Sequence, residues 1–271
     1  MRNILKFTSS ALMIALLSAS AFAHEYWFEP DSFFLTTKQT TALHLNVGEA
    51  LKKDEERVFQ ASKTTSFQMF SNLGVFDMRT MAEDDHAPIV NFMAEKSGTY
   101  MFAMERNWSY IKIEADKFEE YLRDEGMEYI IPERARLGEQ KKEGRERYSR
   151  YIKTLLQVGN ERDATPKRRL DAKLEIVALD NPYTKKVGST TKFQVYFDGA
   201  PLAGYAVFAN NRDGDKYATQ KMTTDKDGKI TVKLDRKGIW LIRLVIMRRC
   251  EKNCNEADWE SYWGALSFGV K

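Results

Sequence analysis

Histidine, cysteine and clustered carboxylate side chains are the groups in this sequence that could bind a metal ion or take part in catalysis. The chain has only three histidines and two cysteines. The first histidine, His24, comes directly after Ala21-Phe22-Ala23, a small-bulky-small triplet of the kind that signal peptidase cleaves. Cleavage at this point would make His24 the first residue of the mature protein.

The residues before His24 have the pattern of a secretory signal peptide. Arg2 and Lys6 supply the basic start, and residues 11–17 form a short apolar run. Residues 1–23 are therefore predicted to be a signal peptide, and the mature chain is expected to be soluble in the periplasm. Removal of two basic residues leaves a net charge of 3 − 2 = +1, which gives no reason to expect nucleic acid as a partner.

A free α-amine beside the imidazole would give the mature His24 two nitrogen donors for one metal ion. Together they would close a six-membered chelate ring, and a divalent metal can displace the proton of an α-amine at neutral pH. Two neutral nitrogens suit Cu(II), Ni(II) or Zn(II). The competing interpretation is that cleavage merely exposes a histidine, and that Tyr26, Trp27 and Phe28 form the first strand.

A complete metal site needs further ligands, and His44 and His86 are the remaining nitrogen candidates. His44 faces away from the apolar side of a strand predicted over 41–47. His86 follows three acidic residues at 83–85, which could hold a cation or simply form a solvated turn. The predicted metal ligands are accordingly His24, His44 and His86, and whether the last two reach the first is left open.

Other chemistry is poorly supported by the sequence. Cys250 and Cys254 are expected to form a short-loop disulfide rather than a soft-metal pair. No nucleophile elbow, phosphate loop or nucleotide fingerprint is present, so the protein is expected not to be an enzyme. Trp240, Trp259 and Trp263 are expected to be core aromatics rather than a sugar-stacking surface.

The elements that must position these residues are predicted to be mainly β-strands. Residues 24–115 read as an antiparallel β-sandwich domain, with strands at 41–47, 66–71, 89–94, 98–105 and 109–114. Residues 171–271 read as an immunoglobulin-like sandwich, with strands at 174–178, 191–197, 205–210, 216–223, 230–234, 239–247 and 262–269. Asp213-Gly214 and Asp227-Gly228 favour tight hairpins between these strands.

The segment between the two predicted domains, residues 116–170, is dense in Glu, Lys and Arg. It is predicted to be a charged helical linker, with a short helix over 117–124 and a longer one over 133–158. Apolar residues recur in the longer predicted helix at helical spacing, which predicts one apolar face. They are Tyr148, Tyr151, Ile152, Leu155 and Leu156.

Seven motifs, in order along the chain, resemble those of a bacterial periplasmic family called domain of unknown function 4198. They are AHEYWFEP at 23–30, FEEYLRDEG at 118–126, RERYSRYIK at 145–153, FDGAPLAG at 197–204, TDKDG at 224–228, GIWL at 238–241 and DWESYW at 258–263. The resemblance covers essentially the whole mature chain. It implies an association with nickel or cobalt uptake, and therefore a transition-metal ion as ligand.

These observations predict a periplasmic accessory protein of transition-metal uptake or homeostasis that binds Ni, Co, Cu or Zn through His24. An envelope metal-transport component would be its partner. The alternative is a metal-independent β-sandwich module that recognises a protein or a glycan. A third interpretation, an oxidative copper enzyme using His24 with His44 or His86, lacks a confirming motif.

Overall fold

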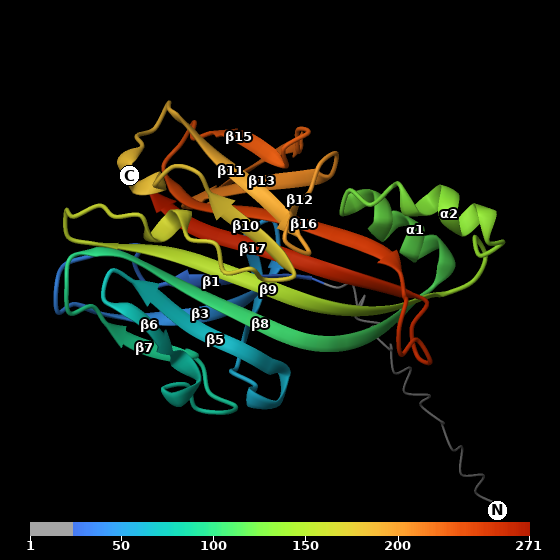
Figure 1. The fold of residues 1–271 in the computed structure, drawn as a ribbon, viewed down its shortest axis with the longest axis horizontal. Coiled ribbons are helices and arrows are strands. Elements are labelled where there is room, and N and C mark those ends of the chain that lie inside the picture. Colours follow the sequence, from blue (N-terminus) through green and yellow to red (C-terminus); the bar gives the residue numbers. More distant parts are fainter. Residues whose placement is uncertain (1–23) are drawn as a thin grey trace, which may run out of the picture.

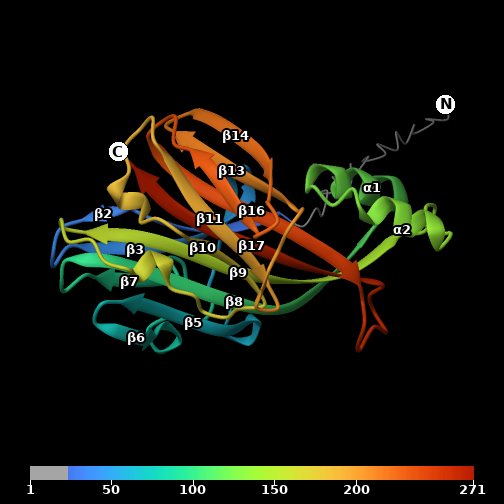
Figure 2. The same ribbon diagram turned by 45° about the horizontal axis from the view of Figure 1, so that its top comes forward.

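A computed structural model describes residues 24–271, which fold mainly into β-strands (Figure 1). The predicted signal peptide, residues 1–23, lies outside the described residues. Two α-helices, α1 (Ala115–Asp124) and α2 (Ile130–Arg136), lie together at one end of the long strands in both ribbon views (Figures 1 and 2). Four short 3-10 helices complete the fold: η1 (Ala61–Lys63), η2 (Met78–Thr80), η3 (Thr165–Lys167) and η4 (Pro182–Thr184).

A nine-stranded sheet forms the centre of the molecule. Its order is β14 (Lys216–Thr223), β13 (Ala206–Asp213), β16 (Gly238–Arg249), β17 (Trp259–Val270), β9 (Gly144–Val158), β8 (Gly98–Ile113), β5 (Thr64–Ser71) and β6 (Gly74–Asp77), and β2 (Phe34–Leu35) also pairs with β9. The neighbours are antiparallel except that β9 runs parallel to both β17 and β2.

Two four-stranded antiparallel sheets accompany the large one. The first contains β1 (Glu25–Pro30), β3 (Thr40–Glu49), β4 (Lys52–Arg57) and β7 (Val90–Met93). The second contains β10 (Leu174–Ala178), β11 (Thr190–Phe197), β12 (Ala200–Pro201) and β15 (Lys229–Lys233).

Alternating side chains of the large sheet enter different cores, because successive residues of a strand point to opposite faces. On β8, Tyr100 and Phe102 pack with Phe28 of the first small sheet. Met101, between them, packs in the core that holds Phe193 of the second small sheet. The small sheets therefore cover opposite faces of the large one, and the helices bury a third core against its β16 and β17 strands.

The predicted fold class, mainly β with antiparallel sandwich packing, is confirmed. All seven strands predicted in residues 171–271 are present, with ends that differ by at most three residues. In residues 24–115 the strands predicted at 98–105 and 109–114 are a single strand, β8, with an irregularity between Arg106 and Ser109. The hairpin at Asp213-Gly214 joins the paired strands β13 and β14, whereas the turn at Asp227-Gly228 connects strands of two different sheets.

The predicted helix over 133–158 is wrong for most of its length. A helix ends at Arg136, and residues 144–158 form β9, a central strand with both faces covered. Leu155 enters one core, while Ile152 and Leu156 enter the other. A strand buried on both faces shows no period-two alternation, so its apolar residues matched a helical spacing by coincidence. The large sheet thus crosses both predicted domain boundaries, and residues 116–170 are not only a linker.

The start of β9 leaves no room for a side chain. A Cβ atom on Gly144 would overlap the ring of Phe118, a fully buried residue of helix α1. Gly144→Ala is therefore expected to lower the free energy of unfolding by about 1–3 kcal/mol, the usual cost of overpacking a core. Urea denaturation measures this difference.

A double-mutant cycle with Phe118→Ala tests whether that overlap is the cause. Without the ring, the added methyl group has space, so Gly144→Ala should cost clearly less in the Phe118→Ala background. An equal cost in both backgrounds would contradict this account of the glycine.

Candidate functional site at the start of strand β1

His24 directly precedes β1, at the end of the first small sheet that lies nearest to helix α1. The register pairs Glu25 with Gly48 of β3. The main-chain oxygen of His24 accepts a hydrogen bond from Nη2 of Arg150, at 3.2 Å. The backbone of His24 is therefore held against the central strand β9.

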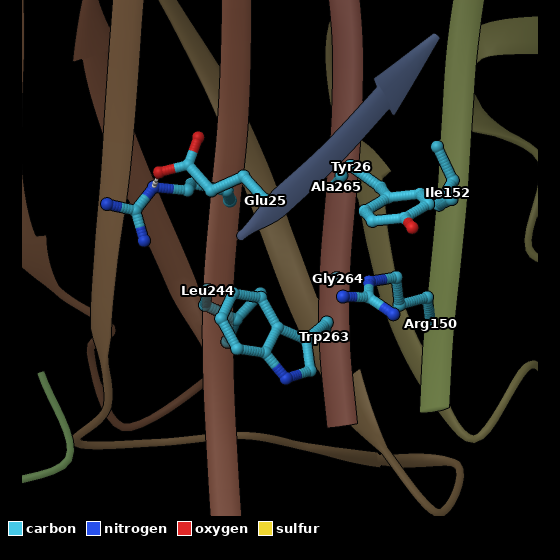
Figure 3. A pocket seen from close by; sticks show the side chains of 9 residues that line it. Glu25, Tyr26, Arg150, Ile152, Leu244, Trp263, Gly264 and Ala265 are labelled. Atoms are coloured by element: carbon cyan, nitrogen blue, oxygen red, sulfur yellow. Dashed lines mark ion pairs between the residues drawn. The ribbon is translucent and has the colours of Figure 1, made fainter. Parts of the chain in front are cut away.

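Arg150 is itself fixed by aromatic rings. Its guanidinium lies 3.9 Å from the ring centroid of Tyr26 and 4.5 Å from that of Tyr148, within the range of cation–π attraction. Figure 3 shows the Arg150 guanidinium beside the Tyr26 ring, with Trp263 below. A cavity of about 10 Å³ lies among these side chains, which is room for about one water molecule.

The imidazole of His24 points toward β4. Its Nε2 atom lies 3.5 Å from Oδ2 of Asp54, and the side chain is 37% exposed. Nδ1, the ring nitrogen nearer to the main chain, makes no ion pair with any residue in the range 24–271. Nδ1 is the nitrogen that forms a six-membered chelate ring together with an α-amine of the same residue.

A cavity of about 180 Å³ opens beside His24, between the ends of β1 and β3 and helix α1. Five carboxyl side chains line it, those of Glu25, Glu49, Glu120, Asp124 and Glu125. Two motifs far apart in the sequence, at 23–30 and 118–126, therefore meet at one acidic cavity. Such a concentration of negative charge attracts cations.

A buried ion-pair triad underlies this cavity. Arg243 of β16 contacts Glu25 through Nε and Glu125 through Nη1. Burial raises the pKa of Glu25 to about 7, although the positive charge of Arg243 acts in the opposite direction. Burial likewise raises the pKa of Glu125. The two carboxylates share one cation, so the triad carries excess negative charge at neutral pH unless a proton or another cation is bound.

A second buried acid, Glu146 of β9, lies near the triad. Its Oε1 accepts hydrogen bonds from the hydroxyl groups of Tyr121 and Ser261. Burial raises the pKa of Glu146 to about 7. Sequence reasoning did not single out Arg150, Arg243, Glu125 or Glu146, although three of these four lie in motifs that carried the family resemblance.

His44 does not share a site with His24. The β1–β3 register places His44 opposite Glu29, four residues along from Glu25, which is about 13 Å at the rise of a strand. Both ring nitrogens of His44 already face carboxylates, Nδ1 with Glu56 at 2.7 Å and Nε2 with Asp31 at 3.0 Å.

His86 lies beyond the far end of β4. Its carbonyl accepts the N–H of Phe59, and its Nδ1 contacts the carbonyl of Asp84 at 2.9 Å. The side chain is 60% exposed. The solvated-turn interpretation of residues 83–86 thus fits this geometry, and the three histidines are not brought together.

Within residues 24–271, no cluster of three or more His, Cys, Asp or Glu side chains has the geometry of a metal site. A site at His24 would therefore depend on the α-amine that cleavage after Ala23 would create. The predicted disulfide between Cys250 and Cys254 is present, with Cα atoms 5.8 Å apart, and it closes the loop between β16 and β17. Trp240, Trp259 and Trp263 are buried core residues, as predicted.

The triad makes a prediction about stability. Arg243→Leu leaves Glu25 and Glu125 buried without their cation, and should lower the free energy of unfolding by about 3–5 kcal/mol at pH 7. Urea denaturation is the measurement. The matched control is Arg136→Leu, because the exposed Arg136–Glu133 pair should contribute at most about 1 kcal/mol. Adding Glu25→Gln and Glu125→Gln to Arg243→Leu should recover part of the lost stability, because no buried carboxylate is then left without its cation. Similar losses in the two arginine variants would contradict the importance of the triad.

His44 makes a prediction about pH. Partial burial opposes charge on its ring, but hydrogen bonds to Glu56 and Asp31 outweigh it, so the pKa of His44 is raised. A raised pKa stabilises the fold below the unfolded-state value of about 6.5, and this contribution is lost as the pH rises through the folded-state value. The stability advantage of the wild type over His44→Gln should therefore be larger at pH 5.5 than at pH 8.5. Urea unfolding at both pH values measures this advantage. A difference in stability that is the same at both pH values would show that the ion pairs of His44 contribute nothing.

No curated protein is similar to the chain in sequence. Among solved structures, the three N-terminal domains of the bacteriophage RB49 Highly Immunogenic Outer Capsid protein (Hoc) match at 10% identity with a TM-score of 0.19. That match covers 90% of this chain and 59% of the capsid chain, and at this TM-score it says nothing about the fold or function.

Within residues 24–271, no helix has the length and apolar character needed to cross a membrane. The family described as "Domain of unknown function (DUF4198)" matches residues 21–248. This range includes the motif at His24, the helix motif beside it and the β9 motif that holds Arg150. The chain therefore belongs to the DUF4198 family.

Proposed function

We propose that this chain is an exported accessory protein that binds a transition-metal ion through His24 once the signal peptide has been removed. The ligands would be the α-amine and Nδ1 of His24, with a carboxylate from the adjacent acidic cavity. The protein would act without catalysis, handing the ion to a metal-transport component of the cell envelope.

The contact between His24 and Asp54 is the observation that carries this proposal. Metal-binding histidines usually present their second ring nitrogen to a carboxylate, which fixes the tautomer and the ring orientation. Asp54 lies against Nε2 at 3.5 Å, which leaves Nδ1 for the metal. Nδ1 is also the ring nitrogen that can chelate a metal ion together with the α-amine of the same residue.

The surroundings of His24 support the same conclusion. Arg150 holds the main chain of the residue through its carbonyl oxygen, so less freedom is lost when an ion binds. The five carboxyl side chains of the cavity would raise the local concentration of a divalent cation. Nitrogen donors with a carboxylate suit Cu(II), Ni(II), Co(II) or Zn(II) rather than calcium or magnesium.

The test uses protein exported with its own signal peptide and confirmed by mass to begin at His24. Calorimetric titration with Cu(II), Ni(II), Co(II) and Zn(II) should show one-to-one binding with a Kd of about 1 μM or tighter for at least one ion. His24→Ala should abolish this binding, because it removes Nδ1 and with it the six-membered chelate ring. Asp54→Asn should weaken it about 10–100-fold.

His86→Ala is the matched control, since it removes an exposed imidazole that lies away from His24, and it should bind metal as the wild type does. Absence of binding by the correctly processed protein, or equal binding by the His24→Ala variant, would refute the proposal. The chain would then be better described as a β-sandwich module for protein or glycan recognition.

A further inference from the structure

A basic groove lies at the other end of the long strands from His24. Its cavity measures about 810 Å³, and its charged lining consists of Arg162, Lys185, Lys186 and Lys271. No carboxyl side chain lines it. We call these four residues and their surroundings the basic groove.

The distance between the basic groove and His24 can be estimated along strand β9, which reaches both. Arg150, which bonds to His24, and Gln157, which lines the basic groove, are seven residues apart on β9. At about 3.3 Å per residue this is about 23 Å. In Figures 1 and 2 the C mark, at the end that carries Lys271, lies at the opposite end of the molecule from α1 and α2.

Hydrogen bonds and ring packing hold the wall of the groove. Tyr183 is buried, its hydroxyl donates to the carbonyl of Leu155 at 2.5 Å, and its ring packs edge-on against Phe34 at 5.3 Å. Nζ of Lys271 lies 4.0 Å from the centroid of the Phe34 ring. Arg162 is anchored by carbonyl oxygens, with Nε donating to Tyr183 at 3.1 Å and Nη1 to Gly159 at 3.2 Å.

These contacts orient the cations without neutralising them, because aromatic rings and carbonyl oxygens carry no net charge. Only Lys185 has an acidic neighbour, Asp180, at 3.5 Å. Among residues 24–271, Arg162, Lys186 and Lys271 make no ion pair. The side chains of the groove and its rim therefore carry 4 − 1 = +3 within one concave surface.

Three uncompensated positive charges repel one another, and an anion in the groove would relieve that repulsion. The cavity is of the size that holds a drug-sized ligand, whereas a single chloride or carboxylate would fill little of it. Lysine and arginine are the residues that bind phosphate groups in proteins. We propose that the basic groove binds a ligand that carries several phosphate groups, either a free polyphosphorylated molecule or a phosphorylated lipid headgroup.

Two probes distinguish the free molecule from the headgroup. Calorimetry with inorganic tripolyphosphate in metal-free buffer tests the first, and flotation with cardiolipin-containing vesicles, against phosphatidylcholine vesicles, tests the second. The variant Lys185→Gln/Lys186→Gln/Lys271→Gln should weaken whichever binding occurs by about tenfold or more, and the binding should weaken as salt is raised.

The matched control is Lys141→Gln/Lys226→Gln/Lys252→Gln, which removes the same total charge from exposed positions outside the groove. It should bind as the wild type does. Lys186→Glu, a single exposed change, serves as a second variant if the triple variant unfolds at a lower temperature. Tripolyphosphate binding that follows this pattern supports a free ligand, and binding to cardiolipin vesicles alone supports a headgroup. No binding of either probe, or equal loss in the two triple variants, would overturn the proposal.

Discussion

The burial of charged side chains on strand β9 is the constraint on which the rest of this structure depends. β9 lies in the middle of the large sheet with both faces covered, yet Arg145, Arg147, Arg150 and Lys153 all lie on it. An unpaired charge in such a position costs several kcal/mol, so each must find a partner. Arg147 pairs with Glu260 of the parallel neighbour β17 at 2.5 Å. The partly exposed Arg145 pairs with Asp258, the residue before β17, at 2.8 Å.

The other two cations extend from β9 toward the small sheets on either side. Lys153 pairs with Glu175 of β10, and Arg150 stacks on Tyr26 of β1 while bonding to His24. Neither small sheet can shift relative to the large one without exposing a buried charge. The position of His24 is therefore a consequence of how the fold satisfies the charges of its central strand.

Two concentrations of like charge lie at opposite ends of the molecule. Carboxyl groups concentrate beside His24, where β1, β3 and α1 meet, and basic groups concentrate where β2, β9, β17 and η4 meet. The mature chain is expected to be almost neutral in sum, so its field at a distance is weak. Close to either end, however, it would select ligands of opposite sign.

The sequence by itself determined the strands of residues 171–271, the short helix predicted at 117–124, the disulfide and the family. These features depend on local signals, namely alternation, turn residues, cysteine spacing and motifs, which are visible along the chain. Only the tertiary structure decided that residues 144–158 form a strand, because a strand buried on both faces loses its alternation and its charges resemble a solvated helix. The tertiary structure also decided which residues surround His24. Asp54 next to His24, the acids of helix α1 and the cation Arg243 come from segments that only long-range pairing brings together, and the same pairing keeps His44 and His86 away.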